Sequence, residues 1–108
     1  MKKIKVHQMT SPRTGRPVAN QFIIKSEGRF KNDVGQIKTS IIKTFQSYDS
    51  IIARITYKGW DTPIVELDKN YWDYSRTTSK YRNEFLRENT NETREKIKNK
   101  EYKLVNLN

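Results

Sequence analysis

Residues 37–59, IKTSIIKTFQSYDSIIARITYKG, decide the fold because they are rich in Ile, Thr, Phe and Tyr, which favour strands. Ile51, Ala53, Ile55 and Tyr57 recur at every second position, which predicts a strand over 51–58 with one apolar face. The pattern breaks at QSYDS, which indicates a bend or a bulge. The preceding residues 37–44 fit either a strand or a short helical turn.

Towards the N-terminus, the segments KKIKVHQM and QFIIK both have the composition of short strands. In the first segment, Ile4 and Val6 fall on one face, and Lys5 and His7 fall on the other. The segment TSPRTGRPVAN between them contains the Pro, Gly, Ser and Asn of a turn. Together they predict a β-hairpin.

The tip of that hairpin, PRTGRP at 12–17, resembles the P-R-G-R-P segment by which an AT-hook enters the DNA minor groove. Minor-groove entry needs arginine, glycine and arginine in direct succession, and Thr14 breaks that order. A turn is therefore the favoured interpretation. It would still display Arg13 and Arg16 at its tip, where they could contact phosphate without reading bases.

Beyond residue 59, the segment PIVELD predicts a further strand, at an edge of the sheet because Pro63 cannot donate to a ladder. The aromatic-rich stripe that follows has helical spacing and predicts a helix over 74–87, capped by Asp73 or Ser75. The residues of this stripe are Tyr71, Tyr74, Thr78, Tyr81 and Phe85.

A second, polar helix is expected over 90–103, because Asn89 followed by Glu92 has the spacing of a capping box. The resulting fold class is α+β, with a small, mainly antiparallel sheet of about four strands and one packed helix. We expect a single domain over 1–88 with a basic insertion around 25–43. Residues 89–108 would form a polar helical C-terminal extension.

The charge of the chain is concentrated at one end. The 108 residues carry a net charge of +10, and residues 1–60 hold 12 Lys and Arg against 3 Asp and Glu. Such a one-sided block indicates a polyanionic partner, although generic solubilising charge is the alternative. There is no cysteine, which fits a reducing cytoplasm, and no apolar run indicates a signal peptide or a membrane span.

Two groups of side chains are candidates for contacting nucleic acid. The insertion could track a phosphate backbone or be a solvated loop; its cations are Lys25, Arg29, Lys31, Lys38 and Lys43. The segment YWDYSRTTSKYR offers Trp72, Arg76 and Lys80, which could combine stacking with phosphate contacts. The helical stripe itself is better explained as core, so Trp72 is the expected exposed contact. Trp60 is ambiguous between a turn residue and a contact.

Catalysis has little support in the sequence. His7 is the single histidine, so a pair of histidine metal ligands is excluded. Glu66 and Asp68 are wrongly spaced from Lys69 for a nuclease that uses two carboxylates and a lysine around Mg²⁺. We therefore expect no catalytic residue, no metal and no cofactor.

The blocks TSPRTGRPVANQF, FQSYDSIIA and YWDYSRTTSKYRNEFL together resemble a family of small bacteriophage and prophage proteins of unknown function. Together with the basic block and the lack of a catalytic constellation, the resemblance leads us to expect a non-enzymatic binding protein in the cytoplasm of a bacterial host. Its most concrete form is an anti-CRISPR protein that binds an RNA-guided nuclease with its guide RNA. A general DNA- or RNA-binding accessory protein and a protein–protein interaction module are the alternatives, and the oligomeric state is open.

Overall fold

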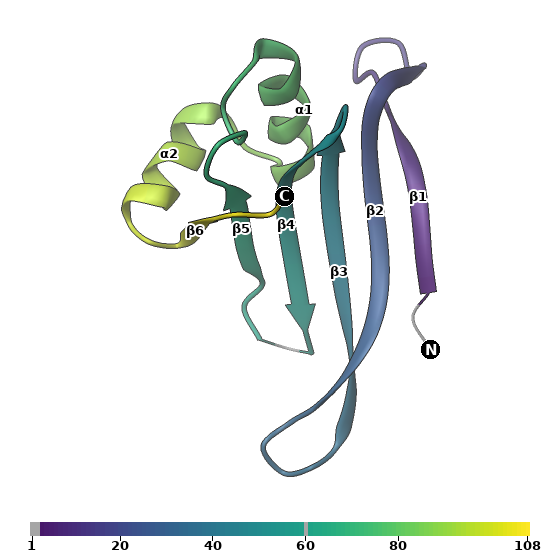
Figure 1. The fold of residues 1–108 in the computed structure, drawn as a ribbon, viewed down its shortest axis with the longest axis vertical. Helices are drawn as coiled ribbons and strands as arrows, with labels where there is room; N and C mark the ends of the chain where they lie inside the picture. Colours follow the sequence, from purple (N-terminus) through teal and green to yellow (C-terminus); the bar gives the residue numbers. More distant parts are fainter. Residues whose placement is uncertain (1–2, 60) are drawn as a thin grey trace.

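The protein is described by a computed structural model that covers residues 3–59 and 61–108, so the expectation for Trp60 lies outside the described residues. One sheet has the strand order β1-β2-β3-β4-β5-β6, antiparallel except for the parallel pair β5 and β6 (Figure 1). The elements, in chain order, are β1 (Lys3–Thr10), β2 (Pro17–Lys31), β3 (Ile37–Ser47), β4 (Ser50–Lys58), β5 (Ile64–Asp68), α1 (Arg76–Leu86), α2 (Thr90–Lys98) and β6 (Tyr102–Val105). The α+β class is confirmed.

The turn at 12–17 is the tip of the β1–β2 hairpin, as the sequence predicts. Ser11 donates its N–H to the carbonyl of Arg16 at 2.8 Å, and Gly15 donates to the carbonyl of Ser11 at the same distance. Gly15 adopts a φ of +72°, which a glycine tolerates without strain. Arg13 and Arg16 are exposed at this tip.

The expected insertion around 25–43 is a long β-hairpin, whose tip projects at the bottom of Figure 1. The register runs without interruption from Gln21 opposite Ser47 to Lys31 opposite Ile37. The interpretation of this segment as a loop is therefore wrong. Its lysines and Gly28 interrupt the apolar alternation from which strands are predicted, while the ladder hydrogen bonds to β3 do not depend on side-chain polarity.

The break predicted at QSYDS is confirmed. The consecutive β3 residues Phe45 and Gln46 pair with Ala53 and Ile51, so Ile52 is the extra residue of a bulge in β4, and a tight turn joins Ser47 to Ser50. Residues 37–44 belong to β3, so the strand alternative for this segment holds. The strand predicted over 51–58 is also present, within β4.

The sheet has six strands rather than about four, and β5 is not its edge. β5 pairs with β4 on one side and with β6 on the other. The helix expected over 90–103 ends at Lys98, because Lys100 adopts a φ of +63° and turns the chain towards the sheet. Residues 89–108 thus supply α2 and also an edge strand. Whether they form a separable extension stays a prediction.

The caps predicted for both helices are confirmed, with Ser75 and not Asp73 capping α1, although α1 begins at Arg76 and not at residue 74. The Ser75 hydroxyl accepts the N–H of Thr78 at the start of α1, and Asn89 and Glu92 form the capping box of α2. Thr78 and Tyr81 are buried, as the stripe predicts. Tyr71 and Tyr74 precede the helix, and they are 37% and 47% exposed, so their assignment to the packed stripe is wrong.

The helices cover one face of the sheet, here called the helix face. Its core contains Phe45, Ile52 and Leu67 from the strands with Tyr81 from α1. The rings of Phe45 and Phe85 are stacked with centroids 5.8 Å apart. The helices lie beside β3–β6, and the far parts of β1 and of the β2–β3 hairpin have no helix next to them (Figure 1). Among the described residues, no helix is long and apolar enough to span a bilayer.

Candidate functional site

Three lysines form a row across the uncovered part of the helix face. Lys25 on β2 is paired with Lys5 on β1 and with Lys43 on β3. Directly opposed residues in a sheet have Cβ atoms roughly 4.5–5.5 Å apart, and like charges at this spacing are destabilising. The fold therefore holds three positive charges side by side at a free-energy cost.

Alternation along the strands places further polar side chains on the same face as this row. His7 lies opposite Ile23, which in turn lies opposite the core residue Phe45. Lys3 lies opposite Glu27, one step further along β1 and β2. Because side chains two residues apart share a face, Arg29 follows Glu27 on this face.

These side chains line a row of adjoining hollows that we call the basic groove. It runs from the C-terminal end of α1 across the lysine row towards the tip of the β2–β3 hairpin, through three adjoining hollows that share Lys25, Lys3 and Glu27. Its charged and titratable lining residues are Lys3, Lys5, His7, Lys25, Glu27, Arg29, Lys43, Glu84 and Arg87.

The hollow nearest α1 is the largest of the three, a cavity of about 600 Å³. Ile23, Ile55 and Tyr57 from the sheet form its floor, and residues 84–87 at the end of α1 form one wall. The ammonium group of Lys43 lies 5.8 Å from the centroid of the Tyr57 ring. The cavity thus combines an apolar floor with a positively charged rim.

The cations of the groove form no ion pair with a described residue. Four ion pairs are present among residues 3–59 and 61–108, and all of them join partners between Arg54 and Lys96. None involves a lysine or arginine of the groove, which has six such side chains against two glutamates. The groove therefore offers uncompensated positive charge to an external anion.

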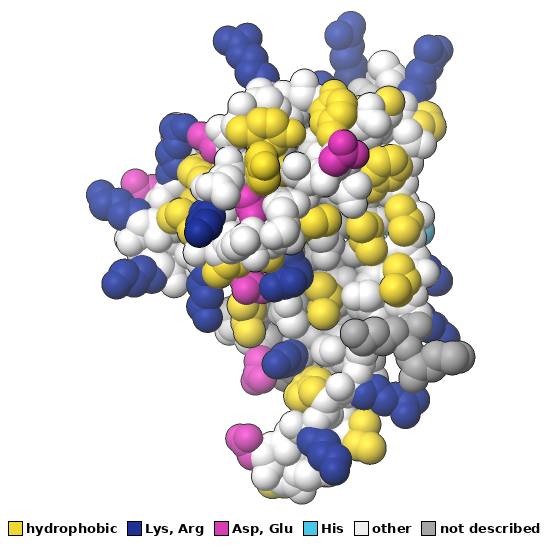
Figure 2. All heavy atoms as spheres, in the orientation of Figure 1, with side chains coloured by type: hydrophobic (Ala, Val, Ile, Leu, Met, Phe, Trp, Pro, Cys, Tyr) yellow, Lys and Arg dark blue, Asp and Glu magenta, His cyan; other side chains and the backbone are white. Residues whose placement is uncertain are grey.

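The opposite face of the sheet, here called the open face, is apolar over the same strands. Hydrophobic side chains gather over β1–β3 in Figure 2, and most Lys and Arg lie around the margin of that view. Ile4 and Val6 are 65% and 60% exposed there, and Val6 is paired with Ile24. On β1, the lysines and the exposed apolar side chains therefore lie on opposite faces of the sheet.

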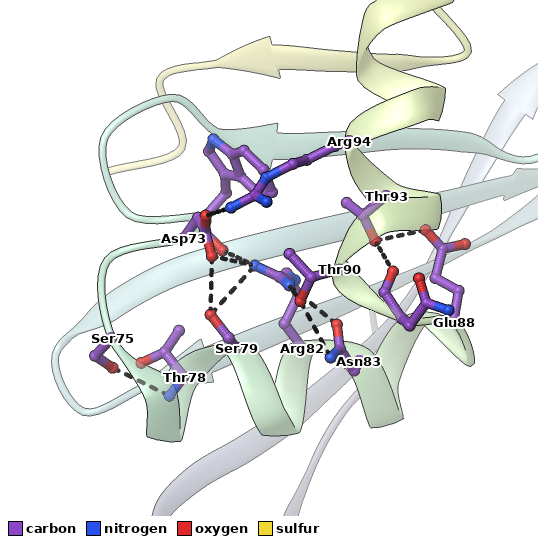
Figure 3. A network of polar contacts seen from close by, with 12 residues as sticks. Asp73, Ser75, Thr78, Ser79, Arg82, Asn83, Glu88, Thr90, Thr93 and Arg94 are labelled. Atoms are coloured by element: carbon purple, nitrogen blue, oxygen red, sulfur yellow. Dashed lines mark hydrogen bonds and ion pairs between the residues drawn. The ribbon is translucent and has the colours of Figure 1, made fainter.

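A buried polar network fixes α1 over the sheet (Figure 3). Arg82 is fully buried, and it donates to the carbonyl of Trp72 and to the Thr90 hydroxyl, the latter at 2.8 Å. Asp73 accepts from Arg94 at 2.8 Å and lies 3.4 Å from Arg82. The network joins the segment before α1 to both helices. It thereby holds the C-terminal end of α1 in place, where residues 84–87 form the wall of the groove.

A second network ties α2 to the edge strand. Glu88 accepts hydrogen bonds from Lys96 at 2.8 Å and from the Tyr102 hydroxyl and the Thr93 hydroxyl at 2.6 Å each. Burial, followed by the hydrogen bond to Glu88, raises the pKa of Tyr102 to about 12. These groups are occupied in holding α2 and β6 together.

The carboxylates that sequence analysis weighed for a nuclease are engaged in structural contacts. Asp68 is fully buried and accepts the backbone N–H groups of Asn70, Tyr71 and Leu107 at 2.8–3.0 Å. Burial alone would raise the pKa of Asp68, but the hydrogen bonds outweigh burial and lower it. Glu66 is paired with Arg54 at 2.9 Å. Among the described residues, no group of three or more His, Asp and Glu side chains could hold a metal ion.

Of the residues predicted as contacts in the insertion, the structure brings Lys25, Arg29 and Lys43 together in the groove. Lys31 lies at the end of β2 without lining the groove. Lys38 is paired with Phe30, and the alternation along β3 places it on the open face.

The other predicted contacts lie outside the groove. Arg13 and Arg16 lie in the β1–β2 turn, at the opposite end of β2 from the tip of the β2–β3 hairpin. Arg76 and Lys80 are exposed on α1. Trp72 is half-buried against the core, with the Arg82 guanidinium carbon 5.1 Å from its ring centroid, so its assignment as an exposed contact is wrong.

Sequence reasoning missed several groove residues, namely Lys3, Lys5, His7, Tyr57 and Arg87. The alternation of Lys5 and His7 opposite Ile4 and Val6 was a usable signal for the β1 members. Nothing in the local sequence indicated Arg87, because the fold of the distant helix brings it there.

No curated protein and no solved structure matches the chain. A family described as a family of unknown function (DUF8033) matches residues 4–102. That range covers every residue of the groove except Lys3, and all of the polar networks described above. The chain belongs to DUF8033, the family of unknown function.

Proposed function

We propose that the protein binds the phosphate backbone of a nucleic acid, free or within a nucleoprotein, along the basic groove, and that it does so without catalysing a reaction. The row Lys5–Lys25–Lys43 carries the proposal. A polyanion would relieve the mutual repulsion of these lysines, and each phosphate bound would release condensed counterions.

The row distinguishes this proposal from generic solubilising charge. Solubilising lysines point outward singly and gain from mutual separation, whereas these three occupy directly opposed positions on adjacent strands. The uncompensated cations also follow a depression instead of being scattered over a convex surface. Both features favour a bound linear anion.

The proposal assigns no catalysis to the protein, and this is supported by the structural hydrogen bonds that three of its carboxylates accept. Asp68, Asp73 and Glu88 each accept hydrogen bonds that hold elements of the fold together. They are therefore not free to bind Mg²⁺ or to act on a proton of a substrate.

A narrower form of the proposal concerns the partner. An RNA-guided nuclease presents exposed phosphates of its guide RNA, and a basic groove suits those phosphates better than it suits mimicry of DNA, which needs an acidic surface. The support for this form is the phage-type resemblance and the sign of the charge.

The test measures the affinity for short labelled single-stranded DNA, RNA and duplex by fluorescence anisotropy across a salt series. We expect log K to fall with log salt, by about 0.7 for each phosphate contacted on a single strand. The double variant Lys25→Gln with Lys43→Gln should bind more weakly and show a smaller slope.

The matched control is Arg76→Gln with Lys80→Gln, which removes the same charge from exposed positions of α1 outside the groove. Equal losses in both double variants would show that net charge alone acts. No binding by the wild-type chain at low salt would overturn the proposal and favour a protein–protein interaction module. A pull-down of an RNA-guided nuclease, with and without RNase, tests the narrower form.

A further inference from the structure

We infer that the cavity at the α1 end of the basic groove holds one unstacked base of a single-stranded nucleic acid, so that the groove prefers single strands to duplexes. This inference rests on the proposed function and names its substrate class. It follows from the chemistry of the cavity, which differs from that of the rest of the groove.

The cavity has an apolar part and a positively charged part, which match the base and the phosphate of a nucleotide. Its floor is apolar, formed by Ile23 and Ile55, with Phe85 and Leu86 on the helix side. Its rim carries the cations Lys25, Lys43 and Arg87. A base has flat apolar faces, and the adjoining phosphate is an anion, so one nucleotide would match both parts at once.

The cavity is large enough to admit a base together with its sugar. Its volume of about 600 Å³ falls within the range of roughly 300–1,000 Å³ that is typical of small-molecule sites. The other two hollows of the groove are smaller, and no hydrophobic side chain is among their described lining residues. A strand lying along the groove would therefore find apolar side chains for a base at one end and mainly backbone contacts elsewhere.

Tyr57 is the side chain placed to stack on such a base. It lines the cavity, is half-buried, and holds its ring 5.8 Å from the Lys43 ammonium. The ammonium group lies over the ring, so a base that stacks on this face would displace it, and the displaced Lys43 could contact the adjoining phosphate. Glu84 is the one carboxylate among the described lining residues of the cavity, and it can accept hydrogen bonds from the N–H groups of a base.

A duplex cannot use this pocket without unstacking a base, which is unfavourable. Its phosphates can still reach the lysine row, so duplex binding should persist at a lower affinity. The comparison between single strand and duplex therefore separates the pocket from the row.

The experiment compares three ligands at one salt concentration. They are a single strand, an abasic strand with the same number of phosphates as that single strand, and a duplex of the same length. We expect the wild-type chain to bind the single strand about tenfold more tightly than the abasic strand, the loss typical of one stacked base. Tyr57→Ala should reduce single-strand affinity to the abasic level, and Tyr57→Trp should restore it. Tyr74→Ala, which removes an exposed tyrosine outside the groove, should change nothing.

Equal wild-type affinity for the single strand and the abasic strand would overturn this inference while leaving the proposed function intact. A Tyr57→Ala variant that loses affinity for all three ligands equally would also overturn it. Failure of every ligand to bind would instead refute the proposed function. The abasic comparison uses the wild-type chain, so it stands even if Tyr57→Ala does not fold.

Discussion

Replacing Lys25 by threonine should make the protein more stable and a weaker binder at the same time. Lys25 is the central member of the lysine row, with Lys5 on one side and Lys43 on the other. Threonine is a good strand residue, and its methyl group keeps part of the contact made by the lysine stem. The substitution therefore removes two opposed like-charge pairs without breaking a hydrogen bond or an ion pair among the described residues.

The size of the gain follows from the pair spacing. Each directly opposed like-charge pair is unfavourable by a few tenths of a kcal/mol, so the free energy of unfolding should rise by about 0.5–1 kcal/mol. For a domain of this size, that corresponds to a rise in Tm of about 2–5 °C. The gain should shrink at high salt, because mobile ions screen charges on an exposed surface.

The assay is thermal unfolding followed by circular dichroism at low and high salt, paired with anisotropy titrations. The matched control is Lys38→Thr, which makes the same change on β3 where the opposed residue is Phe30 and not a lysine. The control should gain no stability and lose little affinity. If Lys25→Thr lowers Tm, or raises it equally at both salt concentrations, the repulsion inferred for the row is refuted.

Three further changes test the networks around the groove. Arg82→Met should lower the free energy of unfolding, measured in urea, by about 3 kcal/mol. The reason is that the carbonyl of Trp72 and the carboxylate of Asp73 lose the buried guanidinium group as a partner. A loss below about 1 kcal/mol would mean that the network contributes little to stability. Hydrogen bonds lower the pKa of Asp68 in the folded protein below its value of about 4 in the unfolded chain. The ionised carboxylate therefore stabilises the fold at any pH above about 4, and this stabilisation is lost as the pH falls through the pKa of the folded protein. Asp68→Asn should therefore be less stable at neutral pH but lose less stability on acidification, and an unchanged acid profile would contradict the role given to the carboxylate. A chain ending at Asn99 lacks β6 and the backbone N–H of Leu107 that donates to Asp68. It should therefore unfold at a lower temperature than the full chain. An unchanged Tm would show that residues 100–108 do not contribute to thermal stability.

Local sequence predicted the elements whose signals are local. The turn at 12–17 depends on Pro12 and Gly15, and the starts of α1 and α2 depend on Ser75 and Asn89. These signals act within a few residues, so they are present before any tertiary contact forms. The alternation that marks 51–58 is equally local; it persists from Ala53 to Tyr57, whereas the bulge at Ile52 puts Ile51 out of phase.

The missed elements lack such signals. β6 has four residues and follows a polar helix, so only pairing with β5 defines it as a strand. In the far part of the β2–β3 hairpin, lysines, Gly28 and polar residues interrupt the apolar alternation from which strands are predicted. Trp72 appeared free for contact because its partner Arg82 lies ten residues away, on α1.

The candidate site divides in the same way. The sequence by itself determined that the N-terminal part is strongly basic and that Lys5 and His7 share a face of one strand. Only the tertiary structure decided that Lys5, Lys25 and Lys43 stand in one row, because strand register is set by pairing between segments far apart in the chain. It also decided that residues 84–87 close the cavity, because the position of α1 is fixed by core packing and by the buried network around Arg82, not by any local pattern.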